Sequence, residues 1–170
     1  MKRIVITGVE NSGKTTLGKE LAKRLGLAFI PEMCRGNQDV LKGTETPSTL
    51  IELNKLQETL AQDVLSSNDL VICDTSGVEL EIWSKSKFKE EIKCEAIVPV
   101  DMYLFCNTLP IWEEDPIRAL PKHEDRKQHE LLFIEKYTEM GKDLIMVPAL
   151  TIEERVEFVV EQLKERNAII

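Results

Sequence analysis

Short apolar runs alternate along the chain with longer segments in which apolar residues recur every three or four positions. Runs of four or five mostly apolar residues occupy positions 4–7, 27–30, 70–73, 102–106 and 144–147. Such runs are typical of strands that are buried on both faces of a sheet. Because these strands alternate with helical segments, the pattern predicts an α/β fold of the P-loop type, with a five-stranded parallel sheet and helices on both faces.

The helical segments between these runs carry recognisable start and stop signals. Helical spacing marks residues 17–25, 50–64, 131–140 and 156–163. Gly26 stands where the first helix would end, and Thr46-Pro47 reads as an N-cap followed by proline at the first helical position. Thr151 and Glu154 form a capping box before the last helix. Together these signals predict a single domain over residues 1–170.

The strongest chemical signal follows the first predicted strand. Residues 8–15 read GVENSGKT, which matches the phosphate-binding pattern G-x-x-x-x-G-K-[ST] between a strand and a helix. In such a loop the backbone N–H groups surround phosphate oxygens, and the helix N-terminus adds a positive dipole end. The residues predicted to hold the nucleotide are Gly8, Glu10, Asn11, Ser12, Gly13, Lys14, Thr15 and Thr16.

Three side chains are predicted to handle the phosphates and a magnesium ion. Lys14 is expected to reach the β- and γ-phosphates, and the Thr15 hydroxyl is expected to bind Mg²⁺. The third predicted strand ends in Asp74, where P-loop proteins place the acid that orders this ion. The D-T-S-G sequence from Asp74 also fits the D-x-x-G pattern of GTPase switches, but no N-K-x-D pattern follows the fourth strand. ATP is therefore the favoured nucleotide, and a GTP- or ATP-binding switch with little turnover is the alternative.

Charged residues after the second and fourth strands are candidates for the transfer step. Glu32 is predicted to orient or deprotonate the acceptor hydroxyl, with Arg35 as a charge partner or phosphate clamp; an exposed ion pair is the alternative. Residues 108–126 hold prolines and charges without apolar periodicity, which predicts a lid loop. Arg118 and Arg126 are expected to close over the γ-phosphate. Trp112 is predicted to stack on a flat ring, or else to anchor the loop to the core.

Composition narrows the class of function. The chain has 170 residues and a formal net charge of -8, which argues against a nucleic-acid groove. The four cysteines show no C-x-x-C spacing and are expected to be reduced. No apolar run approaches the roughly 20 residues that a membrane span requires, and no signal peptide is recognisable, so we expect a cytoplasmic protein. The oligomeric state is not indicated.

The chain resembles the ribosylnicotinamide kinase domain of the bacterial NadR proteins and the wider NadR-like group. The resemblance rests on the P-loop and on matches outside it. Glu32 and Arg35 match an E-x-x-R pattern, Gln57 matches a glutamine in the long second helix, and Asp74-Thr75 match D-T after the third strand. Trp112, Asp115 and Arg118 match W-x-x-D-x-x-R, and Arg126 follows eight residues after Arg118. The chain departs from the family at Met33, where an aromatic residue is common, and at residues 76–79, where another acid and threonines are common.

The resemblance implies a kinase that moves the γ-phosphoryl group of ATP, bound with Mg²⁺, to the ribose 5′-hydroxyl of nicotinamide riboside. It implies that the acceptor is bound by Glu32, Arg35, Gln57, Trp112 and Asp115. A kinase of a different nucleoside or nucleotide is the alternative, because both departures from the family lie where an acceptor would bind.

Overall fold

Five parallel strands form one sheet in the order β2-β3-β1-β4-β5. The structure is a computed structural model that describes residues 3–115 and 117–166. The strands are β1 (Arg3–Thr7), β2 (Ala28–Ile30), β3 (Val71–Asp74), β4 (Met102–Cys106) and β5 (Leu144–Val147). The predicted fold class, with a five-stranded parallel sheet, is confirmed.

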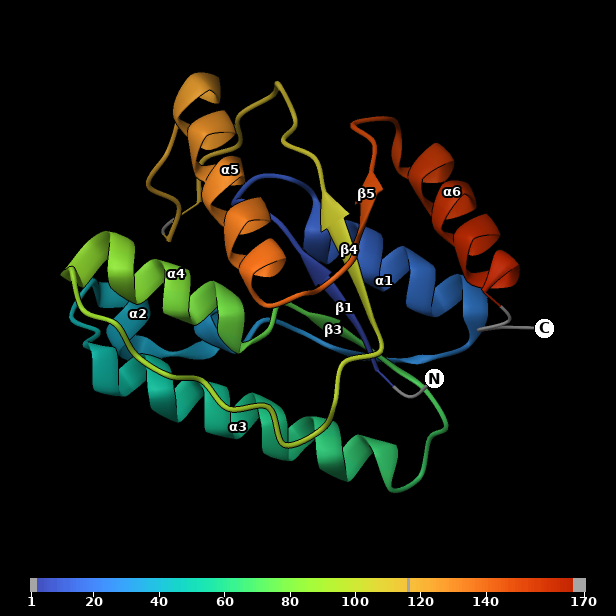
Figure 1. The fold of residues 1–170 in the computed structure, drawn as a ribbon, viewed down its shortest axis with the longest axis horizontal. Coiled ribbons are helices and arrows are strands. Elements are labelled where there is room, and N and C mark those ends of the chain that lie inside the picture. The colour runs from blue at the N-terminus through green and yellow to red at the C-terminus, as the bar shows by residue number, and fades with distance from the viewer. Residues whose placement is uncertain (1–2, 116, 167–170) are drawn as a thin grey trace.

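Helices cover both faces of this sheet, as Figure 1 shows. The helices within the described ranges are α1 (Lys14–Leu25), the 3-10 helix η1 (Met33–Gly36), α2 (Gln38–Lys42), α3 (Pro47–Leu65), α4 (Gly77–Phe88), α5 (His123–Glu139) and α6 (Ile152–Glu165). Leu17 of α1 and Val159 of α6 pack with one set of strand residues. Ala61 of α3, Val78 of α4 and Phe133 of α5 pack with the alternate set, so the core has two layers. No helix in this part of the chain combines the length and apolar character needed to cross a membrane.

The capping signals place helix ends where the sequence predicts them. Gly26 adopts a left-handed conformation with φ 65° and ends α1. The Thr46 side chain accepts a hydrogen bond from the backbone N–H of Thr49, and Pro47 is the first residue of α3. The capping box of Thr151 and Glu154 is present at the start of α6. Short-range side-chain chemistry therefore determines these boundaries.

Several helices differ from the sequence prediction, and the short η1 and α2 were not predicted at all. α4 was not predicted, because its buried Val78, Leu80 and Ile82 alternate with a period of two instead of marking one helical stripe. α5 begins at His123, whereas the prediction began near residue 131. The first two turns of α5 are mostly charged or polar, so they show no apolar helical spacing. The predicted lid therefore ends before His123, and Arg126 lies on a helix.

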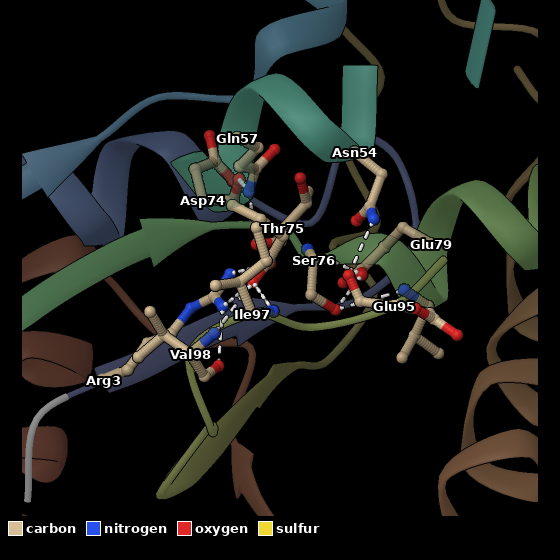
Figure 2. Close-up of polar contacts among 12 residues, drawn as sticks. Arg3, Asn54, Gln57, Asp74, Thr75, Ser76, Glu79, Glu95, Ile97 and Val98 are labelled. Carbon is tan, nitrogen blue, oxygen red and sulfur yellow. Dashed lines mark hydrogen bonds and ion pairs between the residues drawn. The ribbon is translucent and has the colours of Figure 1, made fainter. Parts of the chain in front are cut away.

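A buried ion pair fastens the amino-terminal edge of the sheet. The two outer nitrogens of the Arg3 guanidinium lie 2.7 and 2.8 Å from the two carboxylate oxygens of Glu58 on α3. Glu58 also accepts from the Ile97 backbone N–H at 2.9 Å, and Arg3 donates to the Val98 carbonyl at 3.1 Å. Figure 2 shows Arg3 beside Ile97 and Val98, so this cluster joins β1, α3 and the segment before β4.

Candidate functional site

The P-loop occupies the opposite, carboxyl-terminal edge of the sheet, directly after β1. Gly8 has φ 133°, and a Cβ atom there would lie 2.7 Å from the carbonyl oxygen of Cys106, so a side chain would collide with β4. The Lys14 ammonium donates to the carbonyl oxygens of Gly8 and Val9 at 2.8 and 2.9 Å. The lysine is thus folded against the loop whose backbone would hold phosphates.

Thr15 and Asp74 meet beside the loop, as predicted for a magnesium site. The Thr15 hydroxyl donates to Asp74 Oδ2 at 2.5 Å, whereas the buried Oδ1 of Asp74 has no hydrogen-bond partner. Burial raises the pKa of Asp74, and the nearby Lys14 ammonium opposes this rise. Hydroxyl and carboxylate oxygens suit Mg²⁺, and an unpartnered buried carboxylate oxygen fits a cation. No group of three potential His, Cys, Asp or Glu ligands occurs in the described ranges, so such an ion would also need phosphate and water ligands.

Gln57 lies behind β3 and is not among the residues that line the cavity. Its side-chain NH₂ group donates to the carbonyl oxygens of Asp74 and Thr75 at 3.3 and 2.8 Å. Figure 2 shows this amide reaching from α3 to the end of β3. Thr75 has φ 70°, a conformation that few non-glycine residues adopt, and Gln57 bonds the backbone there. The structure therefore places Gln57 as a support for the Asp74 segment, outside the residues that line the cavity.

A cavity of about 1230 Å³ is lined by several of the predicted residues, among them Lys14, Glu32 and Arg118. It extends from the P-loop past η1 and α2 to α4, and it is also bounded by the loop before α5 and by the start of α6. The charged and aromatic residues that line it include Lys14, Glu32, Arg35, Glu45, Glu79, Trp83, Lys87, Arg118 and Arg155. Small-molecule pockets are commonly about 300–1,000 Å³, so this cavity is large for a single small ligand.

The carboxyl groups of Glu32 and Glu79 line the cavity. Glu32 pairs with Arg35 at 3.2 Å, as predicted. Burial raises the pKa of Glu32, and Lys14 again works against the rise. Glu79 accepts from the Ser76 N–H and hydroxyl at 2.9 and 2.8 Å through Oε2, while its buried Oε1 has no partner. The sequence reasoning missed Glu79, although the Ser76-x-x-Glu79 capping box was a readable signal.

The segment after β4 folds over the P-loop and is tied to it by side chains of the loop itself. The Glu10 carboxylate accepts from the backbone N–H groups of Ala119 and Leu120, at 2.9 Å for Ala119. Asn11 Oδ1 accepts from the Arg118 guanidinium at 2.9 Å. Glu10 and Asn11, which are predicted to bind nucleotide, therefore anchor this segment to the P-loop, and Arg118 lines the cavity.

Arg126 and Trp112 pack against each other, outside the residues that line the cavity. Arg126 is fully buried and donates to the carbonyl oxygens of Leu120 and Pro121 at 3.0 and 2.8 Å, because a buried guanidinium must satisfy its many N–H groups. The Trp112 ring lies 5.1 Å from the Arg126 guanidinium carbon and 5.9 Å from that of Arg118. Neither Arg126 nor Trp112 is among the cavity-lining residues, so both support the loop in this conformation.

Asp115 links the lid to the segment after β2. Its Oδ2 atom lies 2.6 Å from Arg35 Nη1, so Arg35 bridges Asp115 and Glu32. Burial would raise the pKa of Asp115, but the hydrogen bond from Arg35 outweighs it and the pKa is lowered. Arg35 and Asp115 are thus brought together, although only Arg35 lines the cavity.

An aromatic and charged wall closes the α4 end of the cavity. The Lys87 ammonium lies 5.9 Å from the centre of the Trp83 ring and pairs with the buried carboxylate of Glu45. Oε2 of Glu45 is buried without a hydrogen-bond partner. All three residues line the cavity. Sequence reasoning missed Trp83 and Lys87 because α4 was not predicted, and it missed Glu45 because no local pattern marks it.

The phosphate loop at the carboxyl edge of a parallel sheet, with Thr15 and Asp74 beside it, defines a P-loop nucleotide-binding domain. The chain belongs to the AAA_28 family of AAA domains, whose model matches residues 3–155. No curated protein matches the chain in a sequence comparison.

Solved structures of nucleoside and nucleotide kinases share this fold at low sequence identity. NadR in complex with NR superposes with a TM-score of 0.75 at 19% identity, over 99% of this chain and 52% of that chain. The chain thus spans about half the length of NadR. Thymidylate kinase from Candida albicans gives a TM-score of 0.68 at 13% identity, over 98% and 92% of the two chains. Deoxyadenosine kinase from M. mycoides with bound dATP gives 0.64 at 14%, over 95% and 99%.

Proposed function

We propose that the chain is a small-molecule kinase that transfers the γ-phosphoryl group of ATP to the 5′-hydroxyl of a nucleoside, with nicotinamide riboside as the acceptor. The observation that carries the proposal is the single cavity, which exposes Lys14, two carboxyl groups and an aromatic wall to the same space. The fold shared with NadR in complex with NR supports the choice of acceptor. The wider likeness to deoxyadenosine and thymidylate kinases supports the reaction class.

On the donor side, the P-loop backbone and Lys14 hold the phosphates. Thr15 and Asp74 would hold Mg²⁺, which neutralises charge on the β- and γ-phosphates when it is bound. Arg118, held beside the loop by Asn11, adds a positive charge to the same wall of the cavity. Positioning and charge neutralisation supply most of the rate in phosphoryl transfer, and these residues provide both.

On the acceptor side, Glu32 orients the hydroxyl group and Trp83 contacts the ring. Glu32 lines the cavity, and burial raises the pKa of its carboxyl group, which makes it a better proton acceptor. Trp83 takes the stacking role that the sequence suggested for Trp112, because Trp83 lines the cavity and Trp112 does not. A tryptophan face attracts a flat pyridinium cation by roughly 0.5–2 kcal/mol, depending on desolvation.

A panel of acceptors tests the proposal. ADP formation is measured with nicotinamide riboside, cytidine, uridine and the deoxynucleosides for the wild type, Trp83→Ala and Trp112→Ala. We expect nicotinamide riboside to have the highest kcat/KM and Trp83→Ala to raise its KM far more than the KM of ATP. Trp112→Ala is the matched control and should have the smaller effect. A neutral nucleoside preferred by about tenfold or more would contradict the choice of acceptor and leave the kinase proposal standing.

A nucleoside monophosphate is the second candidate acceptor. The Lys87 side chain is 42% exposed, so it could approach a phosphate group at the α4 end of the cavity. The same assay with nucleoside monophosphates separates the two candidates. Lys87→Gln should impair a monophosphate acceptor strongly and nicotinamide riboside only slightly.

A further inference from the structure

The first turns of α6 place a buried arginine against the P-loop. Arg155 is 2% exposed and lines the cavity. A Cβ atom at Gly13 would lie 2.7 Å from Arg155 Nη1, so the guanidinium lies directly on the turn that leads into α1. No sequence motif pointed to this residue, and the phosphate-loop pattern does not include it.

Arg155 has no negatively charged partner in the described ranges. None of the ion pairs there includes it, and its Nε and Nη2 atoms are buried without hydrogen-bond partners. The thiol of Cys106 lies close to it, but burial raises the pKa of this thiol to about 11, so the thiol is neutral near pH 7. A buried charge without a counterion is strongly unfavourable, so Arg155 is a candidate to bind an anion.

The other buried arginines show how this protein normally compensates such a charge. Arg3 forms a two-point pair with Glu58. Arg126 donates to several backbone carbonyl oxygens. Arg155 has neither kind of acceptor, and it is the one of the three that lines the cavity. The missing partner is therefore expected to be a ligand and not a part of the chain.

We propose that Arg155 binds a phosphate group of the nucleotide held by the P-loop. Phosphate oxygens supply the negative charge that the chain does not, and arginine pairs with phosphate through several N–H groups at once. Gly13 belongs to the loop whose N–H groups surround the phosphates, so the contact at Gly13 places the guanidinium at the edge of that group. This proposal rests on the nucleotide-binding part of the proposed function and is independent of the acceptor.

Isothermal titration calorimetry of the full chain with Mg·ATP tests the proposal without an acceptor. The variants are Arg155→Gln, Arg155→Lys and the control Arg166→Gln, which removes the same charge from the exposed far end of α6. Arg155→Gln should weaken Mg·ATP binding on the order of 10- to 100-fold, as expected for the loss of hydrogen bonds to a charged group. The Mg·ATP affinity of Arg155→Lys should lie between those of Arg155→Gln and the wild type. The affinity of Arg166→Gln should stay within about twofold of the wild type. Without nucleotide, Arg155→Gln should melt at or above the temperature of the wild type, because an uncompensated charge is removed.

Three results would overturn the proposal. The first is Mg·ATP affinity in Arg155→Gln equal to that of the wild type. The second is a fall of several degrees in the melting temperature of nucleotide-free Arg155→Gln, or its failure to fold, which would assign Arg155 a structural role. The third is a loss of adenosine binding in Arg155→Gln that equals its loss of Mg·ATP binding. That result would place the contact at the nucleoside instead of the phosphates. If the wild type itself bound no Mg·ATP, the proposed function would fail as well, so the two failures are distinguishable.

Discussion

The two edges of the sheet differ in how they compensate buried charges. At the amino-terminal edge, both carboxylate oxygens of Glu58 are bonded to Arg3, so the two charges neutralise each other, and Arg3 Nε is the atom of this pair left without a partner. At the carboxyl-terminal edge, Asp74, Glu79 and Arg155 each keep buried polar atoms without partners. A polar group left unpaired in the interior reduces stability, so natural proteins retain such groups mainly where a ligand completes them. The difference indicates that the first edge serves stability and the second serves binding.

This comparison predicts its largest effect at the amino-terminal edge. Glu58→Gln removes the counterion of a fully buried Arg3, and breaking one side of a buried pair typically costs about 3–5 kcal/mol. Urea unfolding should show this loss, while kcat at a temperature where the variant is folded should be unchanged. Glu91→Gln is the control, because it breaks an exposed pair with Lys85 and should leave the unfolding midpoint unmoved. A fall in kcat of folded Glu58→Gln would show that the two edges are not separate in function.

The reverse outcome is expected at Lys14. Lys14→Ala removes the cation of the phosphate loop but no core contact, since the side chain bonds only to loop carbonyls. We expect kcat to fall by at least about a hundredfold, as for the loss of one strong electrostatic contact. The melting temperature without nucleotide should stay within a few degrees of the wild type. Unchanged turnover would contradict the role of the P-loop in the reaction.

Two acids at the carboxyl-terminal edge should give different kinetic phenotypes. Glu32→Gln should lower kcat roughly tenfold to a hundredfold and leave Mg·ATP affinity nearly intact, because Glu32 acts on the acceptor. The burial that raises the Glu32 pKa should also place the acid limb of the wild-type pH profile above the usual carboxyl range, and the variant should lose that limb. Asp74→Asn should instead raise the Mg²⁺ concentration needed for half-maximal rate. If the two phenotypes were exchanged, the roles of Glu32 and Asp74 would be reversed.

The smallest effect concerns two capping-box glutamates with opposite environments. Burial raises the pKa of Glu79, so the folded state holds its proton more tightly than the unfolded state and loses stability as pH rises through the raised value. Glu79→Gln removes this pH-dependent loss of stability. The difference in melting temperature, variant minus wild type, should therefore be larger at about pH 8 than at about pH 5.

The exposed Glu154 is the matched control for this prediction. The hydrogen bond from Thr151 lowers the pKa of Glu154, so its carboxylate adds stability above the unfolded pKa and loses it as pH falls through the lowered value. Glu154→Gln should therefore be less stable than the wild type near pH 8. Differences that do not change with pH, or that share one sign, would contradict the environments assigned to the two glutamates.

The parts of the site that could be predicted from sequence lie in continuous segments. The P-loop is eight consecutive residues between a strand and a helix, and Asp74 ends a run of apolar residues, so their positions follow from local pattern. The helix caps at Gly26, Thr46 and Thr151 are equally local. Each of these features depends on neighbours within a few residues, and each is present in the structure.

The remaining site residues depend on contacts between distant segments. Glu45 and Lys87 meet across the cavity although 42 positions separate them, and no local pattern marks either one. Arg155 lies within an ordinary amphipathic helix, and only the packing of α6 against α1 brings it to Gly13. Trp112 looked like a ligand contact because it lacked a core pattern, but two arginines pack against its ring. Tertiary packing decided these roles.

The central claim is that the cavity transfers a phosphoryl group from the P-loop nucleotide to a nucleoside bound beside it. The most direct test is ADP formation from Mg·ATP by the wild-type chain with and without nicotinamide riboside, with the phosphorylated nucleoside identified by mass spectrometry. The account predicts that the nucleoside raises ADP formation by at least about a hundredfold and that one monophosphate appears for each ADP. Tight nucleotide binding with slow ADP formation, unchanged by this or any other nucleoside or nucleoside monophosphate, would contradict the claim and indicate a nucleotide-dependent switch.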